Sequence, residues 1–266
     1  MSTRPLEGEW ALILGASSGF GEAASLELAS LGMHILGVHL DRKTTLANVE
    51  RITKEIKAKG QEALFFNMNA ADSDRRREVL DAFHARSGGS SSIRVLLHSL
   101  AFGTLKPFIA DTEEARLTKA QMEMTLDVMA NTLVYWTQDL VRRKLMGAGG
   151  RIFAMTSAGG TRVWKTYGAV SAAKAALESH VRQLALELSP LGITVNAIMA
   201  GVTDTPALRK IPGSDQMIQM ALAKNPSGRL TMPQDVADAI GLLAHPKAQW
   251  VTGNVICVDG GEFVVD

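Results

Sequence analysis

The sequence predicts an α/β protein with a doubly wound parallel sheet in a single domain. Short apolar runs alternate with longer amphipathic stretches along the whole chain, which is typical of βαβ units. A glycine-rich turn joins the first apolar run to the first amphipathic stretch. No low-complexity linker divides the 266 residues, so we expect one domain over 1–266. The apolar runs predict about seven parallel strands. Right-handed crossovers between them place helices on both faces of the sheet.

The expected strands and helices alternate in order. We expect strands at 10–15, 34–38, 63–67, 93–101, 151–155, 193–199 and 253–261. The expected helices cover 20–32, 44–60, 72–86, 119–146, 167–188 and 232–245. The segment 203–229 is irregular because it contains three prolines. We expect it to be a helical substrate lid at the carboxyl edge of the sheet, where α/β folds bind ligands.

Composition excludes several classes of protein. With 46% hydrophobic residues and a net charge of +1, the chain can bury a core but is not suited to bind nucleic acid or a membrane surface. Cys257 is the single cysteine, which excludes an internal disulfide and fits a reducing compartment. The first ten residues lack a signal-like apolar run, and no stretch of 18 apolar residues occurs. We therefore expect a cytoplasmic protein without a membrane partner, and we assign no metal ligand.

The glycine-rich turn points to a dinucleotide. Glycines after a strand let the backbone turn tightly and approach a pyrophosphate at a helix N-terminus, as in a Rossmann fold. The spacing here is G-x-x-x-G-x-G, and a turn packed only for structural reasons is the alternative. The third glycine favours the binding site. The predicted cofactor-binding residues are Gly15, Ser17, Ser18, Gly19, Phe20 and Gly21.

A tyrosine and a lysine begin the helix at 167–188. Tyr167 lies seven residues before Lys174, and Ser157 lies seventeen before it. Seven residues return to nearly the same helix face after about 10 Å, so both side chains can reach one pocket. A core tyrosine with an unrelated surface lysine is the alternative. We predict that Tyr167 and Lys174 face one catalytic pocket.

The loop "GASSGFG", the Tyr/Lys helix and the tail "VICVDGG" occur in that order. From about residue 10 to residue 263, the chain resembles the short-chain dehydrogenase/reductase superfamily. The resemblance implies a nicotinamide cofactor and a homotetramer built on two long central helices. The superfamily norm is Tyr-x3-Lys, but Val170 occupies that tyrosine position. The Tyr-x6-Lys spacing resembles the divergent enoyl-acyl-carrier-protein reductases instead. The resemblance implies that Tyr167, Lys174 and Ser157 are catalytic and that Lys174 also binds the cofactor.

Two more departures favour the same subgroup. The run "HSLAFG" at 98–103 resembles the His-Ser-Ile-Ala/Gly-Phe of enoyl reductases and replaces Asn-Asn-Ala-Gly. We interpret His98 itself as a packing residue. Met129 occupies the position of the usual catalytic asparagine, whereas Asn131 faces elsewhere. The resemblance also assigns cofactor binding to Ser99, Leu100, Ala101, Gly201, Val202, Thr203 and Thr205.

The cofactor type depends on the end of the second strand. His39 stands where the superfamily usually has an acid, and Asp41 follows two residues later. Arg42 and Lys43 offer positive charge to a 2′-phosphate, although a solvated helix start explains them equally. We expect His39 and Arg42 to contact the cofactor and NADPH to be preferred over NADH. Asn69 and Ala70 are expected beside the adenine ring.

The expected activity is that of an NAD(P)H-dependent enoyl-acyl-carrier-protein reductase of fatty-acid synthesis. Hydride would pass to the β-carbon of a trans-2-enoyl thioester, Tyr167 would stabilise the enolate oxygen, and Lys174 would bind the nicotinamide ribose. The partner would be an acyl thioester on an acyl carrier protein. A 3-oxoacyl or hydroxysteroid-type dehydrogenase is the alternative that Ser157 favours. A non-catalytic dinucleotide sensor is the alternative of another class.

The apolar residues and the basic residues of the expected lid, 203–229, each have two interpretations. The apolar set could line an acyl pocket or simply pack: Leu208, Ile211, Met217, Ile218, Met220 and Leu222. The basic set could meet an acidic carrier protein or form a solvated face: Arg209, Lys210, Lys224 and Arg229.

Overall fold

A parallel sheet of seven strands runs through the computed structural model, which describes residues 6–87 and 92–265. The strand order is β3-β2-β1-β4-β5-β6-β7, as in a doubly wound fold. The strands are β1 (Trp10–Leu14), β2 (His34–His39), β3 (Ala63–Asn67), β4 (Ile93–His98), β5 (Arg151–Ser157), β6 (Thr194–Ala200) and β7 (Val255–Val258). This confirms the predicted fold class and the approximate number of strands.

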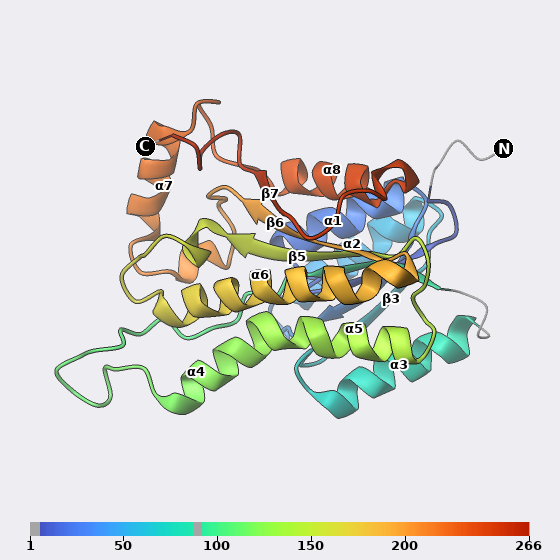
Figure 1. Cartoon of the computed structure of the whole chain (residues 1–266), viewed down its shortest axis with the longest axis horizontal. Coiled ribbons are helices and arrows are strands. Elements are labelled where there is room, and N and C mark those ends of the chain that lie inside the picture. Colours follow the sequence, from blue (N-terminus) through green and yellow to red (C-terminus); the bar gives the residue numbers. More distant parts are fainter. Residues whose placement is uncertain (1–5, 88–91, 266) are drawn as a thin grey trace.

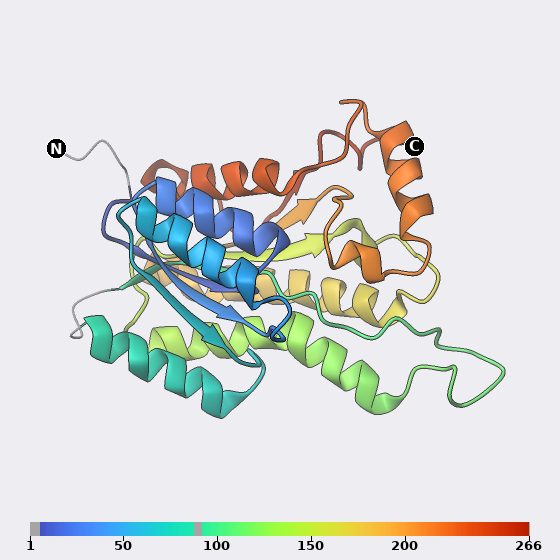
Figure 2. The same ribbon diagram turned by 180° about the vertical axis from the view of Figure 1, so that it is seen from behind.

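Helices cover both faces of the sheet (Figure 1). The helices are α1 (Gly19–Ser30), α2 (Leu46–Ala58), α3 (Ser73–Ser87), α4 (Lys119–Leu126), α5 (Thr132–Arg142), α6 (Gly168–Leu188), α7 (Ser214–Lys224) and α8 (Pro233–Ala244). Helices α1, α2 and α8 form one layer, and α3 to α6 form the other, as the reverse view in Figure 2 also shows. Helix α7 stands apart, beyond the carboxyl ends of the strands.

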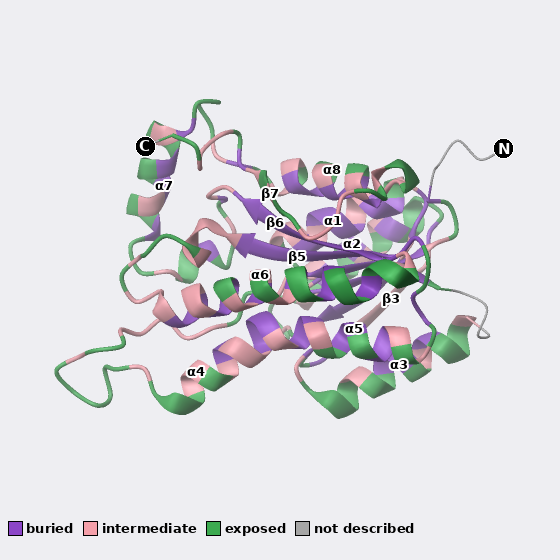
Figure 3. Ribbon diagram, in the orientation of Figure 1, coloured by how far each residue is buried: buried purple, intermediate pink, exposed green. Residues whose placement is uncertain are grey.

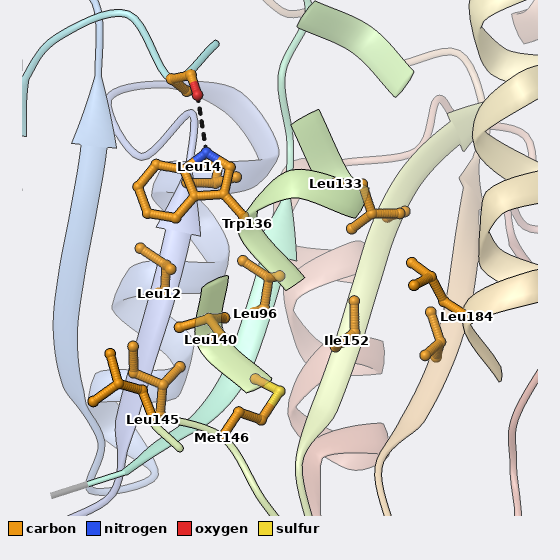
Figure 4. Close-up of a cluster of buried hydrophobic side chains, with 14 of the residues drawn as sticks. Leu12, Leu14, Leu96, Leu133, Trp136, Leu140, Leu145, Met146, Ile152 and Leu184 are labelled. Atoms are coloured by element: carbon orange, nitrogen blue, oxygen red, sulfur yellow. Dashed lines mark hydrogen bonds between the residues drawn. The ribbon is translucent and has the colours of Figure 1, made fainter. Parts of the chain in front are cut away.

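The sheet is buried between the two helix layers, as the purple strands in Figure 3 show. All five residues of β1 and all seven of β6 are buried, because parallel strands covered on both faces are apolar throughout. In the layer of α5, the side chains of Leu12, Leu96 and Ile152 meet Leu133 and Leu140 (Figure 4). This core therefore fixes the positions of the strand ends, on which a site can be built.

The helix expected at 119–146 is interrupted. A π-helical turn, η1 (Asp127–Asn131), separates α4 from α5, and α5 ends at Arg142. The hydroxyl of Thr132 donates to the Val128 carbonyl (2.8 Å) and also contacts Nε2 of His98 (2.8 Å). Polar side chains that bond to the backbone in this way disturb the regular helical ladder. The prediction of one continuous helix was wrong at this point.

The carboxyl ends of the strands gather at the left of Figure 1. Strands are added outward from β1 to β3 on one side and from β4 to β7 on the other, so the strand order reverses between β1 and β4 and a topological switch point lies there. The segment 203–229 lies at this edge and contains a short 3₁₀ turn, η4 (Leu208–Lys210), before α7. Among the described helices, none is long and apolar enough to cross a lipid bilayer.

Candidate active site

The glycine turn contacts the end of β4. Gly15 has φ +92°, a conformation that favours glycine, and a side chain on it would collide with the Ser99 carbonyl. Backbone N–H groups of Gly15 and of Ser99 bond to the Val38 and Leu14 carbonyls at 2.8 and 2.9 Å. The sequence-predicted residues of both segments therefore lie together at the switch point.

The first turn of α1 fits a phosphate. Ser18 is its N-cap residue but makes no side-chain capping bond, so the first backbone N–H groups remain open to an anion. A side-chain carbon on Gly19 would lie 3.5 Å from Cγ2 of Thr205, which brings the loop after β6 to the same place. These residues can therefore hold the pyrophosphate of a dinucleotide.

The end of β2 presents an anchored carboxylate. Nδ1 of the buried His39 lies 2.9 Å from Oδ2 of Asp41. Burial alone would raise the pKa of Asp41, but hydrogen bonds from Thr45, Ser17 and His39 lower it overall. Arg42 is exposed in the turn that follows. The acid at the end of β2 is therefore Asp41, held beside His39, which occupies the usual acid position.

The two residues expected at the adenine ring differ in exposure. The Asn69 side chain is exposed and accepts a hydrogen bond from the Ala71 N–H at 3.0 Å. Ala70 is buried in the core, and its carbonyl accepts from Nε1 of Trp136 at 2.9 Å, the dashed line in Figure 4. The Ala70 side chain is therefore part of the core, and only its backbone N–H remains for a ligand.

Ser157 and Tyr167 lie next to each other. Ser157 ends β5, and Tyr167 is the N-cap residue of α6. A side-chain carbon on Gly159 would lie 2.6 Å from the Tyr167 ring and 3.2 Å from Oγ of Ser157. Burial raises the pKa of the Tyr167 phenol, and the Ser157 hydroxyl beside it opposes that rise. The phenol therefore stays protonated at neutral pH and can donate a hydrogen bond.

Lys174 is buried two turns further along α6. Its Nζ donates to the Met155 carbonyl on β5 at 2.6 Å. Burial lowers the pKa of Lys174 to about 8, although the nearby Glu178 carboxylate opposes this. Glu178 itself accepts a hydrogen bond from Thr156 at 2.6 Å. Lys174, Tyr167 and Ser157 thus share the junction of β5 and α6.

Apolar side chains fill the positions of the superfamily's usual tyrosine and asparagine. Val170 and Met129 are buried in one hydrophobic cluster, against which the Tyr167 ring packs. A side-chain carbon on Gly103 would lie 2.9 Å from both Sδ of Met129 and Cγ2 of Val170. Asn131 instead contacts Nε2 of His180 at 3.1 Å. Neither of these two side chains can supply the hydroxyl or amide of the usual pair.

His98 is fully buried beneath the cluster. Because the Thr132 hydroxyl donates to Val128, Nε2 of His98 must donate to Thr132, and Nδ1 has no partner among the described residues. Burial lowers the pKa of His98 to about 3. A neutral imidazole enclosed in this way packs and does not exchange protons with a substrate.

The loop after β6 approaches the C-terminal segment. The Val202 N–H donates to Oε2 of Glu262 at 3.0 Å, and the Thr203 hydroxyl donates to the Gly201 carbonyl at 3.0 Å. Burial raises the pKa of Glu262. Bound nicotinamide would have to compete with Glu262 for this N–H. The tail residue carried no signal in the sequence, whereas Gly159 could have been found from the glycine pair that follows Ser157.

A hydrogen bond joins segment 203–229, the predicted lid, to the segment before α6. Nε1 of Trp164 donates to the Pro212 carbonyl at 3.1 Å. Leu208 and Ile218 are buried, while Met220 and Leu222 are exposed. Arg209 pairs with Asp204 and Asp215, and Arg229 pairs with Asp235. The apolar residues of segment 203–229 are therefore partly buried and partly exposed, and two of its basic residues are already ion-paired, so neither group forms one continuous surface.

Known proteins match this chain over nearly its whole length. The family model described as enoyl-(acyl carrier protein) reductase matches residues 15–262. An NADPH-dependent aldehyde reductase-like protein, chloroplastic, of Arabidopsis thaliana is 30% identical over 97% of this chain and 95% of its own. A 1-cyclohexenylcarbonyl-CoA reductase of Streptomyces collinus is 30% identical over 96% of this chain and 86% of its own. Other relatives are described as 3-oxoacyl-acyl-carrier-protein reductases.

A solved structure agrees with the fold. The enoyl-acyl-carrier-protein reductase (NADH) of Aquifex aeolicus VF5 superposes with a TM-score of 0.83 at 25% identity, covering 97% of this chain and 98% of that one. The chain therefore belongs to the short-chain dehydrogenase/reductase superfamily, in the family described as enoyl-(acyl carrier protein) reductase. It is an oxidoreductase of the kind that uses a nicotinamide cofactor.

Proposed function

We propose that this oxidoreductase reduces the 2,3 double bond of a trans-2-enoyl thioester. One observation carries the proposal: the phenol beside Ser157 belongs to Tyr167, seven residues before Lys174, while Val170 at the usual tyrosine position is packed in an apolar cluster. The only phenol at the junction of β5 and α6 among the described residues is therefore one helical turn nearer the N-terminus of α6 than in Tyr-x3-Lys proteins.

The displaced phenol suits the geometry of a conjugated substrate. In a carbonyl reduction, the oxygen is bonded to the carbon that takes the hydride. In a 2-enoyl thioester, hydride adds to the β-carbon and the charge develops on the thioester oxygen, two carbons away. The Tyr167 phenol lies further from Lys174, toward the N-terminus of α6, than the phenol of Tyr-x3-Lys proteins, so it can reach that more distant oxygen.

The residues divide the work as follows. When bound, the reduced nicotinamide supplies the hydride. Tyr167 donates a hydrogen bond to the thioester oxygen as the electron pair moves onto it, as an oxyanion-hole donor does. Lys174, charged below a pKa of about 8, binds the nicotinamide ribose and favours negative charge near the phenol. A proton then adds to the α-carbon, so the double bond gains one hydride and one proton.

One relative and the description of the matching family support an enoyl substrate. The 1-cyclohexenylcarbonyl-CoA reductase acts, by its name, on a conjugated enoyl thioester of coenzyme A, and the family description names an enoyl carried on acyl carrier protein. We propose an acyl-carrier-protein thioester in fatty-acid synthesis. Arg209 and Arg229 are already ion-paired, so Lys210 is a better carrier contact than either arginine.

We also propose NADPH as the preferred cofactor. The exposed Arg42 supports it, because a guanidinium can bind a 2′-phosphate. Asp41 opposes it, since its carboxylate stays ionised in the same turn. Comparing the Michaelis constants for NADPH and NADH tests this, and Arg42→Ala should raise only the constant for NADPH. A strong NADH preference would contradict it.

A 3-oxoacyl or hydroxysteroid-type dehydrogenase is the second candidate. Ser157 lies beside Tyr167, so the two hydroxyls could polarise a carbonyl together. Several relatives are described as 3-oxoacyl reductases, and one as an aldehyde reductase-like protein. The apolar cluster of Val170 and Met129 argues against it, because it leaves no proton relay on the central helix.

One assay separates the candidates. Cofactor oxidation is followed with a trans-2-enoyl thioester and, separately, with a 3-oxoacyl thioester. Enoyl turnover alone supports the proposal, oxoacyl turnover alone supports the second candidate, and cofactor binding without turnover indicates a sensor. Tyr167→Phe should lower kcat roughly a hundredfold, as loss of an oxyanion-hole donor does. Tyr135→Phe, at the only other tyrosine, is the matched control and should leave kcat unchanged.

A further inference from the structure

Two arginines meet at the end of the sheet opposite the active site. Arg94 is the second residue of β4, and Arg151 is the first residue of β5. The two strands pair in parallel with Val95 opposite Arg151, so the arginines lie near each other. Arg151 is only 1% exposed, whereas Arg94 is partly exposed. In Figure 1 this is the end from which β5 starts, away from its arrowhead.

Backbone atoms enclose the buried guanidinium. Nη1 of Arg151 donates to the carbonyls of Gly149 (2.8 Å) and Gly150 (3.1 Å), and Nη2 lies 3.5 Å from the Pro246 carbonyl. Gly149 has φ +87°, and a side chain on it would collide with Nη1 of Arg94. The Arg94 guanidinium therefore lies against the same loop that holds Arg151.

The charges of the pair are not neutralised within the described residues. Neither arginine forms an ion pair with a carboxylate there, and both Nε atoms are buried without a hydrogen-bond partner. Burial lowers the pKa of Arg151, and the charge of Arg94 lowers it further. Two adjacent positive charges repel strongly when one of them is removed from water. The pair has the donors for an anion but no anion of its own.

We propose that Arg94 and Arg151 bind a small tetrahedral oxyanion of the phosphate or sulfate class. The planar guanidinium presents paired N–H donors that match two oxygens of such an ion. The partly exposed Arg94 gives the ion a path from solvent, and the enclosed Arg151 supplies charge that solvent does not screen. Neither arginine belongs to the junction of β5 and α6, so this site is independent of the proposed function.

Thermal unfolding tests the site. The melting temperature of the full chain is measured while inorganic phosphate replaces chloride at constant ionic strength. We expect a saturable rise of about 3 °C or more with phosphate. Arg94→Ala should remove that part of the rise. Any phosphate bound at the N-terminus of α1 affects both proteins equally and cancels in the comparison.

A second variant keeps the test decisive. Arg94→Asp supplies an internal carboxylate beside Arg151, so it should raise the melting temperature in chloride and remove the phosphate response. Arg75→Ala, which removes an exposed arginine on α3, should keep the wild-type response. The same phosphate response in wild type and both Arg94 variants, or no response beyond that of chloride in wild type, would overturn the proposal. Turnover of the thioester substrate should be unchanged in Arg94→Ala under either buffer.

Discussion

Lys174 shows at the scale of one residue how a site opposes stability. A charged ammonium at this position is 6% exposed, and burial lowers its pKa to about 8. The charge that we propose to bind the ribose therefore destabilises the folded chain. Active sites commonly bury polar groups that the function requires, although an apolar side chain there would make the folded chain more stable.

We predict that Lys174→Met stabilises the protein while impairing cofactor binding. The pKa falls from 10.5 to about 8, which corresponds to about 3 kcal/mol at neutral pH. Loss of the hydrogen bond to Met155 offsets roughly 1 kcal/mol of this. Below about pH 8 the lysine is charged in both folded and unfolded chains, so the gain is complete there. It is lost as pH rises from about 8 through 10.5, above which the lysine is neutral in both states.

Urea unfolding at several pH values measures this difference. Lys57→Met, at an exposed lysine of α2, is the control and should change the free energy of unfolding little. A Lys174→Met protein that is less stable than wild type at pH 7 would show that the buried charge is better compensated than burial indicates.

His98 makes the protein sensitive to acid. The pKa of His98 is about 3 in the folded chain, against the ordinary histidine value of 6.5. The unfolded chain therefore binds more protons than the folded chain between about pH 3 and pH 6.5. Stability should therefore fall by about 1.4 kcal/mol per pH unit as pH drops below 6.5. His98→Asn should remove this slope, because an amide does not titrate.

The free energy of unfolding at pH 7, 5.5 and 4.5 checks the acid sensitivity. His84→Asn replaces an exposed histidine of α3 and should keep the wild-type slope. Equal slopes in wild type and His98→Asn would mean that another group governs acid unfolding.

The sequence was informative about these residues where one helix fixes their spacing. Tyr167 and Lys174 could be placed on a common face because both lie at the start of α6. Asp41 was noticed, but its bond to His39 depends on the turn after β2 and could not be read from spacing. The contact of Glu262 with Val202 joins residues 60 positions apart, which no local pattern encodes.

At the scale of elements, α6 packs against the segment after β4 too closely to accept a tyrosine at position 170. Val170 is 4% exposed, and its Cγ2 leaves no room for a side chain on Gly103. The segment and the helix fit each other only with a small residue on both sides. The Tyr-x6-Lys spacing and the glycine of "HSLAFG" are therefore parts of one packing arrangement.

We predict that restoring the usual spacing fails. Val170→Tyr combined with Tyr167→Phe should lower the free energy of unfolding by about 1–3 kcal/mol through overpacking. It should not create 3-oxoacyl reduction, because the new phenol has no space beside Met129. Urea unfolding and both thioester assays measure the outcome, with Val170→Ile as a milder overpacking control. A stable double variant that reduces the 3-oxoacyl thioester would contradict this account.

Element boundaries were predictable where periodicity was undisturbed. The strands at β1 to β3 match the expected segments within a residue or two, since apolar runs between turns define them. The π-helical turn was missed because no local apolar pattern marks it, and the Thr132 hydroxyl there bonds to the Val128 carbonyl and contacts His98 on another element.

At the scale of the whole molecule, the alternation of strands and helices was enough to predict the sheet. Right-handed crossovers leave few ways to arrange alternating strands and helices, so the carboxyl edge and its switch point followed. What the surfaces bind could not be predicted in the same way. Arg94 and Arg151 are distant in sequence, and only the pairing of β4 with β5 brings them together.

The outer face of the α5 and α6 layer is our last prediction. Leu186 on α6 is 71% exposed and Tyr135 on α5 is 38% exposed, and Figure 3 shows exposed turns along α6. Large apolar side chains on adjacent helices indicate an interface. We propose that these helices join copies into a homotetramer, so Leu186→Glu should lower the mass measured by light scattering by half or more.

A second exposed apolar residue makes the test specific. Ile109 is 90% exposed in the loop before α4 and is on neither α5 nor α6, so Ile109→Glu should keep the wild-type mass. Because a glutamate at position 186 would be desolvated only if a partner covers it, the loss of mass should also be relieved at low pH, where the carboxyl is protonated. A wild-type monomer would overturn the proposed assembly, and dissociation caused by Ile109→Glu but not by Leu186→Glu would place the interface elsewhere.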